Sequence, residues 1–179
     1  MHGLVSLIEE EYYQRVEDIW GRLKKSFNLE GILITPFPHF SWQVAEDYDF
    51  DLLEQKMEEI SLTIKPFVLY TAGLGIFTGE KPVIFIAINK NNQLIEIHKK
   101  IWEMFNEIAF NSLEHYKSEN WIPHISIAYE DVSKNNIGEV MRYLAFENFY
   151  WKMKIDNLAF IFEPTGEIGK LKYRFKLQG

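Results

Sequence analysis

The sequence predicts an α+β fold of two pseudo-symmetric lobes, each with antiparallel strands and helices outside, that enclose a central cleft. Both halves of the chain show the same order of elements: a long helix, a strand bearing His-x-Ser, a second helix, and two strands joined by a glycine-containing turn. The motifs at His39 and His124 lie 85 residues apart, and no low-complexity linker divides them. We therefore expect a single bilobal domain over residues 1–179, with a first half to about residue 90 and a second half over about 91–179.

The first half is predicted to contain two helices and three strands. Ser6 followed by Glu9 resembles a capping box, and apolar side chains then recur at helical spacing as far as Phe27. Pro36 and Pro38 exclude a helix just before the first His-x-Ser strand, in which apolar and polar residues alternate. The predicted elements are a helix over residues 6–27, an extended stretch from residue 31, a strand over 39–44, a helix over 49–65, and strands over 67–77 and 82–89.

The second half repeats this pattern. Asn91 and Asn92 are suited to cap a helix whose apolar side chains continue to about Phe110 or beyond. The predicted elements are this helix, a strand over residues 121–129, a helix over 135–146, and strands over 149–162 and 169–177.

Composition excludes several kinds of site and partner. The chain has no cysteine, which excludes disulfides, thiolate zinc sites, iron–sulfur clusters and a cysteine nucleophile. Its 26 acidic and 19 basic residues give a net charge of −7, which disfavours long nucleic acid duplexes. No apolar run approaches the roughly 20 residues of a membrane span, and the first residues lack the features of a signal peptide. We expect a cytoplasmic protein with no membrane partner that acts on a small nucleotide or a short RNA end, and we leave its oligomeric state open.

The two His-x-Ser motifs are the strongest candidates for chemistry. Side chains at i and i+2 of a strand share one face, so His39 lies beside Ser41 and His124 beside Ser126, while the apolar residues between them face the core. Across a cleft, one imidazole could deprotonate water while the other protonates a leaving oxygen, because histidine titrates near pH 6.5. The serines could donate hydrogen bonds to non-bridging phosphate oxygens. This chemistry needs no metal or other cofactor, and either histidine could be the acid.

At these residues the chain resembles the two-histidine (2H) phosphoesterase superfamily, in particular its bacterial branch of 2'-5' RNA ligases and RNA cyclic phosphodiesterases. The matching segments are His39-Phe40-Ser41-Trp42 and His124-Ile125-Ser126-Ile127. The resemblance covers about residues 30–179 and includes a glycine-aromatic turn and apolar strand within residues 74–88. It implies a metal-independent phosphodiesterase acting on a 2',3'-cyclic phosphate or a 2'-5' linkage, with the two histidines as acid and base, the two serines as phosphate ligands, and ligase activity not excluded. Many relatives carry a basic residue soon after the second motif, where this chain has Tyr129 and Glu130.

Aromatic residues near the first motif are candidates for stacking on a base. Phe37 and Trp42 flank His39, and base–aromatic stacking stabilises single-strand complexes by roughly 1–3 kcal/mol. The parity of Trp42 along its strand favours the core over the cleft. Tyr129 shares the parity of Ile127, so we expect it in the core as well.

The other histidines are expected to be structural. His98 lies on the apolar side of the third predicted helix and His115 near its end, and neither has carboxylates at ligand spacing, so we expect no metal site. His2 lies in a terminus that we expect to be mobile.

Two other interpretations compete with an enzyme. The first is a catalytically inactive module that binds a nucleotide or an RNA end in the same cleft. The second is a structural protein whose repeated motifs are an accident of duplication.

Overall fold

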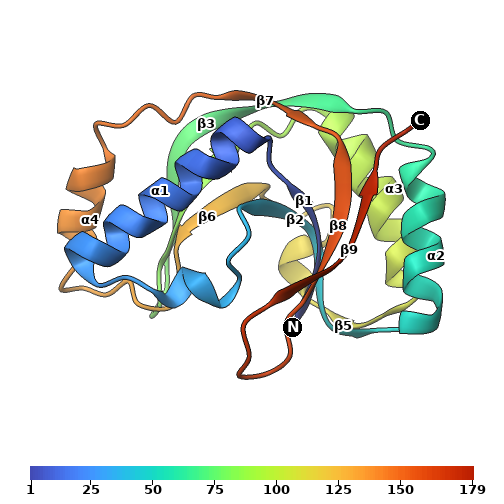
Figure 1. Cartoon of the computed structure of the whole chain (residues 1–179), viewed down its shortest axis with the longest axis horizontal. Helices are drawn as coiled ribbons and strands as arrows, with labels where there is room; N and C mark the ends of the chain where they lie inside the picture. The colour runs from blue at the N-terminus through green and yellow to red at the C-terminus, as the bar shows by residue number, and fades with distance from the viewer.

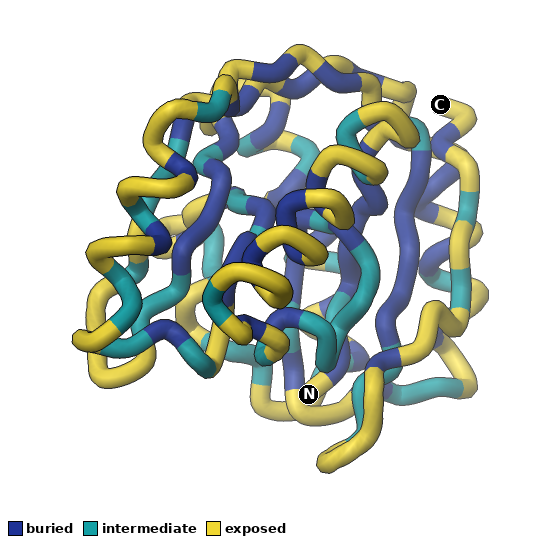
Figure 2. The backbone as a smooth tube through the Cα atoms, turned by 60° about the vertical axis from the view of Figure 1, so that its left-hand side comes forward, coloured by how far each residue is buried: buried dark blue, intermediate teal, exposed yellow.

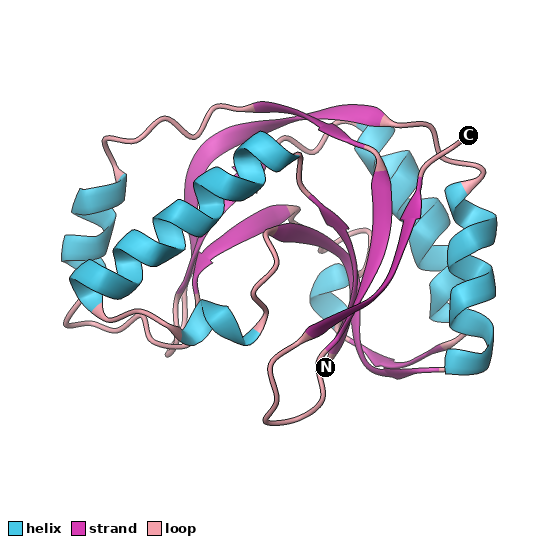
Figure 3. Ribbon diagram, in the orientation of Figure 1, coloured by secondary structure: helices cyan, strands magenta, loops and turns pink.

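The computed structural model describes residues 1–179, which form four helices and two antiparallel sheets (Figures 1 and 3). The strand orders are β5-β2-β1-β8-β9 in the first sheet and β6-β4-β3-β7 in the second. The elements are β1 (His2–Leu7), α1 (Glu10–Phe27), β2 (His39–Tyr48), α2 (Phe50–Ser61), β3 (Phe67–Phe77), β4 (Val83–Ile88), α3 (Asn92–Asn106), β5 (Ala109–Ser112), β6 (His124–Ala128), α4 (Ile137–Leu144), β7 (Lys152–Ile155), β8 (Asn157–Phe162) and β9 (Lys170–Lys176), with short 3-10 helices at Gly31–Ile34 and Glu114–Tyr116.

The predicted α+β fold is confirmed, but the lobes do not coincide with the halves of the sequence. Each sheet combines strands from both halves: β8 pairs with β1 in the first sheet, and β7 pairs with β3 in the second. Neither half of the sequence could form a complete sheet alone. In each sheet, strands from the first half lie at the centre and pair with strands from the second half. This interleaving joins the two lobes into one folding unit.

The helices lie on the outside of the sheets. α2 and α3 contact strands of the first sheet, whereas α1 contacts β6 of the second sheet and lies beside α4 (Figure 1). The α1 helix therefore packs against a sheet that contains neither of the strands it connects, β1 and β2. Figure 2 shows the buried residues along the strands and the inner faces of the helices, with exposed residues on the outer turns. No helix is long and apolar enough to cross a membrane.

The first predicted helix begins later than residue 6. Residues 2–7 form β1, a central strand of the first sheet, and α1 starts only at Glu10. Ser6 caps no helix: its buried hydroxyl donates to the Asn157 carbonyl and accepts from the Trp42 indole. The sequence pattern was ambiguous because β1 is buried on both faces, so its apolar residues do not alternate with polar ones.

Further elements differ from the prediction, including the strand expected over 149–162, which forms two strands, β7 and β8, in different sheets. Residues 31–34 form a short 3-10 helix instead of an extended stretch. The third long helix ends at Asn106, and the following residues form β5, which pairs with the end of β2. An apolar sequence continues through this break, so helical periodicity alone could not place it.

The buried Trp121 lies where the two lobes meet. It precedes β6 in the second sheet, and its indole N–H donates to the carbonyl oxygen of Ser41 on β2 at 2.9 Å. Its ring stacks on His98 of α3 at 4.0 Å and on Trp42 at 5.5 Å between ring centroids. On the other lobe, the indole of Trp20 on α1 donates to the Ser126 carbonyl at 3.3 Å. The two motif strands are thus held side by side without pairing directly.

Gly75 provides a test of the packing behind the second motif. A Cβ atom at this position on β3 would overlap the ring of Phe85, which is buried against Phe77 and His124. We expect Gly75→Ala to lower the free energy of unfolding by about 1–3 kcal/mol in urea titrations, because the ring has little room to move. The matched control is Gly138→Ala in α4, where no atom lies within 4 Å and the free energy should stay equal or rise. An unchanged urea midpoint for Gly75→Ala would contradict this packing.

Candidate active site

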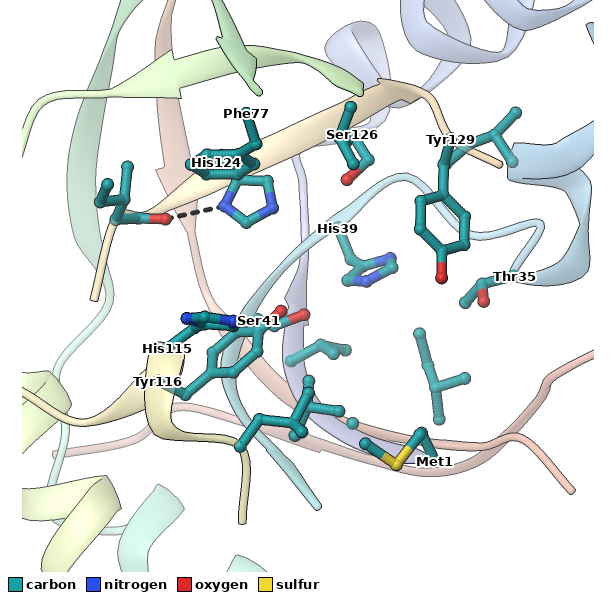
Figure 4. A pocket seen from close by; sticks show the side chains of 18 of the residues that line it. Met1, Thr35, His39, Ser41, Phe77, His115, Tyr116, His124, Ser126 and Tyr129 are labelled. Atoms are coloured by element: carbon teal, nitrogen blue, oxygen red, sulfur yellow. Dashed lines mark hydrogen bonds between the residues drawn. The ribbon is translucent and has the colours of Figure 1, made fainter. Parts of the chain in front are cut away.

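The two motifs meet at one cavity of about 800 Å³ between the lobes. His39 and Ser41 project into it from β2, and His124 and Ser126 from β6 (Figure 4). The intervening residues Phe40 and Ile125 are fully buried on the opposite faces. The structure therefore brings together all four predicted motif side chains, and the core residues between them fix each strand's register.

Both histidines are oriented in the same way. The Nδ1 atom of His39 lies 2.5 Å from the Phe37 carbonyl oxygen, and that of His124 lies 2.7 Å from the Ile122 carbonyl oxygen. A carbonyl oxygen only accepts, so Nδ1 carries the proton in each ring and Nε2 is the atom available for proton transfer. In both motifs a proline lies between the carbonyl and the histidine, and it confines the preceding residue to extended conformations. The Pro-His sequence thus sets the orientation of each ring.

The enclosure of the site favours neutral imidazoles at rest. Burial lowers the pKa of His39 to about 4, the hydrogen bond to Phe37 opposes this shift, and the charge of His124 adds to it. Burial also lowers the pKa of His124, and its hydrogen bond to Ile122 opposes the shift. His124 packs edge-on against Phe77, with 4.8 Å between the ring centroids. Without a ligand, both rings are therefore mainly neutral near pH 7.

Several cavity residues were not predicted. Tyr129 lines the cavity instead of the core, because β6 ends at Ala128 and Glu130 has a positive φ of 72°, which breaks the strand alternation. Its backbone position is closely constrained, since a Cβ on Gly31 would overlap the Tyr129 carbonyl oxygen. Burial raises the pKa of Tyr129 to about 12, and a hydrogen bond with Glu130 adds to the shift, so the phenol stays neutral.

The opposite side of the cavity is lined by the short 3-10 helix after β5. His115, expected to be structural, lines the cavity there together with Tyr116 (Figure 4). Burial raises the pKa of Tyr116 above its usual value, and its interaction with the Ser41 side chain opposes this shift. Thr35 and Glu163 line the other end, where the threonine hydroxyl donates to the carboxylate. Nothing in the local sequence around these residues marks them as cavity residues, because the fold brings them in from separate loops.

The two candidates for base stacking do not line the cavity. Trp42 is 1% exposed and lies in the core, as its strand parity indicated. Phe37 packs against the small cluster formed by Val5, Leu7, Ala159 and Ile161, although its carbonyl orients His39. The prediction of stacking is therefore wrong for Trp42, which is buried in the core. For Phe37, which is partly exposed outside this cavity, it stays a prediction.

The remaining histidines have structural positions. The predicted role of His98 is confirmed: it is 1% exposed, and its Nε2 bonds to the Trp42 carbonyl at 3.1 Å. His2 is not in a mobile terminus, since it is buried in β1 and stacks on Phe162 at 4.5 Å. No group of three or more His, Asp or Glu side chains is placed to hold a metal ion.

Comparisons with known proteins agree with this geometry. The family model described as "2'-5' RNA ligase superfamily" matches residues 13–166. Relatives from Bacillus cytotoxicus and Bacillus anthracis, both named "Putative phosphoesterase", are 21% identical to this chain, with 90% of each chain covered.

Solved structures share the fold. The crystal structure of TT0787 from Thermus thermophilus has a TM-score of 0.67 at 14% identity and covers 99% of this chain and 98% of its own. A crystal structure described as a phosphoesterase has a TM-score of 0.61 at 11% identity, with the same coverage. Because the family model spans most of the chain and the two motifs face one cavity, the protein belongs to the 2'-5' RNA ligase superfamily of two-histidine phosphoesterases.

Proposed function

We propose that this protein is a metal-independent phosphodiesterase that hydrolyses a 2',3'-cyclic phosphate or a 2'-5' linkage of a small nucleotide or RNA end. The observation that carries the proposal is the pair of imidazoles, each held through Nδ1 to a carbonyl and each with Nε2 facing the same cavity. Such a pair can remove one proton and supply another on opposite sides of a phosphorus atom. The cavity of about 800 Å³ is within the usual size range for a small ligand.

In the proposed reaction, water attacks phosphorus as one Nε2 removes its proton. The bond between phosphorus and the ribose oxygen breaks, and the other imidazolium gives its proton to that oxygen. The products are a phosphate monoester and a free ribose hydroxyl. At the end of a turnover the base carries the proton taken from water, and the acid has lost its own proton to the leaving oxygen. Ser41 and Ser126 donate hydrogen bonds to the non-bridging oxygens, where negative charge concentrates in the transition state.

We assign His39 as the base and His124 as the acid. A base must begin neutral, and burial lowers the pKa of His39 to about 4. The acid must begin protonated, and we assign this role to His124 as the second imidazole of the pair. A bound phosphate anion lies next to both rings and favours the imidazolium form of the acid.

The alternative is a module that binds a nucleotide or RNA end without turnover. It has the same cavity and the same phosphate ligands, so its distinguishing result is binding without product. The matched geometry of the two Nε2 atoms favours the enzyme, since binding alone does not require both rings to be held in one tautomer.

Removing either imidazole tests the proposal directly. We expect His39→Ala and His124→Ala each to lower kcat on nucleoside 2',3'-cyclic phosphates by about 100- to 10,000-fold, because each removes one proton transfer. Product formation should be followed by chromatography in a buffer containing a chelator, with urea unfolding of each variant as the folding control. Full activity in either variant, or loss of wild-type activity with chelator, would rule out this mechanism.

The pH profile tests the assignment of acid and base. For the free enzyme, kcat/KM should rise with pH as His39 loses its proton at about pH 4 and fall again as His124 loses its own. Because burial lowers the His124 pKa from its usual value near 6.5, we expect kcat/KM to begin its decline with rising pH below about pH 6.5. A profile that still rises above neutral pH would exclude these two pKa values as the controlling ones.

Leaving-group chemistry separates the two roles. A p-nitrophenyl phosphodiester expels a stable phenolate and has little need of a proton donor. We therefore expect the fold-loss of activity in His124→Ala to be at least about ten times smaller on this ester than on a cyclic phosphate. His39→Ala should be impaired on both substrates. The reverse pattern in steady-state kinetics would exchange the roles of the two histidines.

A further inference from the structure

The cavity offers very little fixed positive charge. No Lys or Arg side chain lines it, and its one carboxylate belongs to Glu163. Tyr129 stays neutral because burial raises its pKa to about 12. The Nδ1 atom of His2 accepts the backbone N–H of Glu163 at 3.0 Å, and burial lowers the pKa of His2, so this ring is mainly neutral as well. A bound anion therefore has no Lys or Arg partner in the cavity, and its candidates for counter-charge there are imidazoles, namely the His39–His124 pair and His115.

Two lysines that contact residues at or next to the cavity lining are already engaged. Lys81 forms an ion pair with Glu130, next to Tyr129. Lys90 donates to the carbonyl oxygens of Ser118 at 3.2 Å and Trp121 at 2.8 Å. Moving either lysine toward a ligand would break these interactions.

Glu163 places negative charge at one end of the cavity. The side chain is half-buried and accepts a hydrogen bond from Thr35. The Glu163 charge contributes to the raised pKa of Tyr129, so it interacts electrostatically with another residue of the cavity lining. The amino group of Met1, which also lines the cavity, bonds to the Glu163 backbone carbonyl at 3.2 Å, and because it is exposed, water screens its charge.

We propose that the cavity selects substrates whose cyclic phosphodiester is their only charged group, and that Glu163 acts against substrates with a second phosphate. This inference rests on the proposed function and narrows its substrate class. A cyclic diester carries one negative charge, which the single imidazolium of the His39–His124 pair balances. A terminal phosphate adds about −1.5 to −2 charges at pH 7. That charge would find no Lys or Arg partner in the cavity and would be repelled by the Glu163 carboxylate.

The experiment compares adenosine 2',3'-cyclic phosphate with the same compound bearing a 5'-phosphate, at pH 7.5. We expect kcat/KM to favour the 5'-hydroxyl compound by on the order of tenfold, since like charges repel appreciably at a partly buried site. Glu163→Gln keeps an acceptor for Thr35 and should reduce this ratio to within about threefold. The matched control is Glu167→Gln, which removes the same charge from an exposed position of the same loop that pairs with Lys170, and it should leave the ratio unchanged.

Binding of products separates this inference from the proposed function. Calorimetry should give a smaller Kd for adenosine 2'-monophosphate than for adenosine 2',5'-bisphosphate, again by on the order of tenfold, and Glu163→Gln should reduce the difference. If neither cyclic compound is hydrolysed, the proposed hydrolysis of cyclic phosphates fails, and the two Kd values still decide the charge preference. Equal or tighter binding of the bisphosphate, or a ratio that Glu163→Gln does not change, would overturn the inference.

Discussion

The buried indole of Trp121 is the interaction on which the site depends. It joins the lobes by donating to the Ser41 carbonyl of β2 from a position just before β6, while its ring stacks on His98 and Trp42. Both motif strands meet here without pairing, so a side-chain donor satisfies a backbone acceptor that a neighbouring strand would otherwise satisfy. If β2 and β6 paired directly, the sheets would merge and the space between the histidines would close.

The same arrangement accounts for the electrostatics of the cavity. Because the two strands face each other across a partly enclosed space, both imidazoles are partly shielded from water and their pKa values are lowered. The carbonyls of Phe37 and Ile122 fix the proton on Nδ1 of each ring and leave both Nε2 atoms directed at a bound ligand. Rings held in one tautomer need no reorganisation when the proton is transferred, which is the general advantage of a preorganised polar site.

Interleaved strands explain why the cavity is only partly visible in the sequence. The motifs were recognisable because each is local: a proline, a histidine and a serine within four residues of one strand. Tyr129 was misplaced by assuming that strand alternation continues, whereas the positive φ of Glu130 ends it. Thr35, Tyr116 and Glu163 come from three separate loops and share a cavity only because strands from both halves complete each sheet.

By itself the sequence determined the fold class, the position of most elements, and the pairing of each histidine with a serine on a strand face, because all of these follow from local periodicity and proline placement. Only the tertiary structure decided that residues 2–7 form a central strand instead of a helix start, since burial on both faces removes the alternation that marks a strand. It also decided which side chains surround the histidines. Those contacts join residues up to 162 positions apart, as between Met1 and Glu163, and no local sequence pattern predicts them.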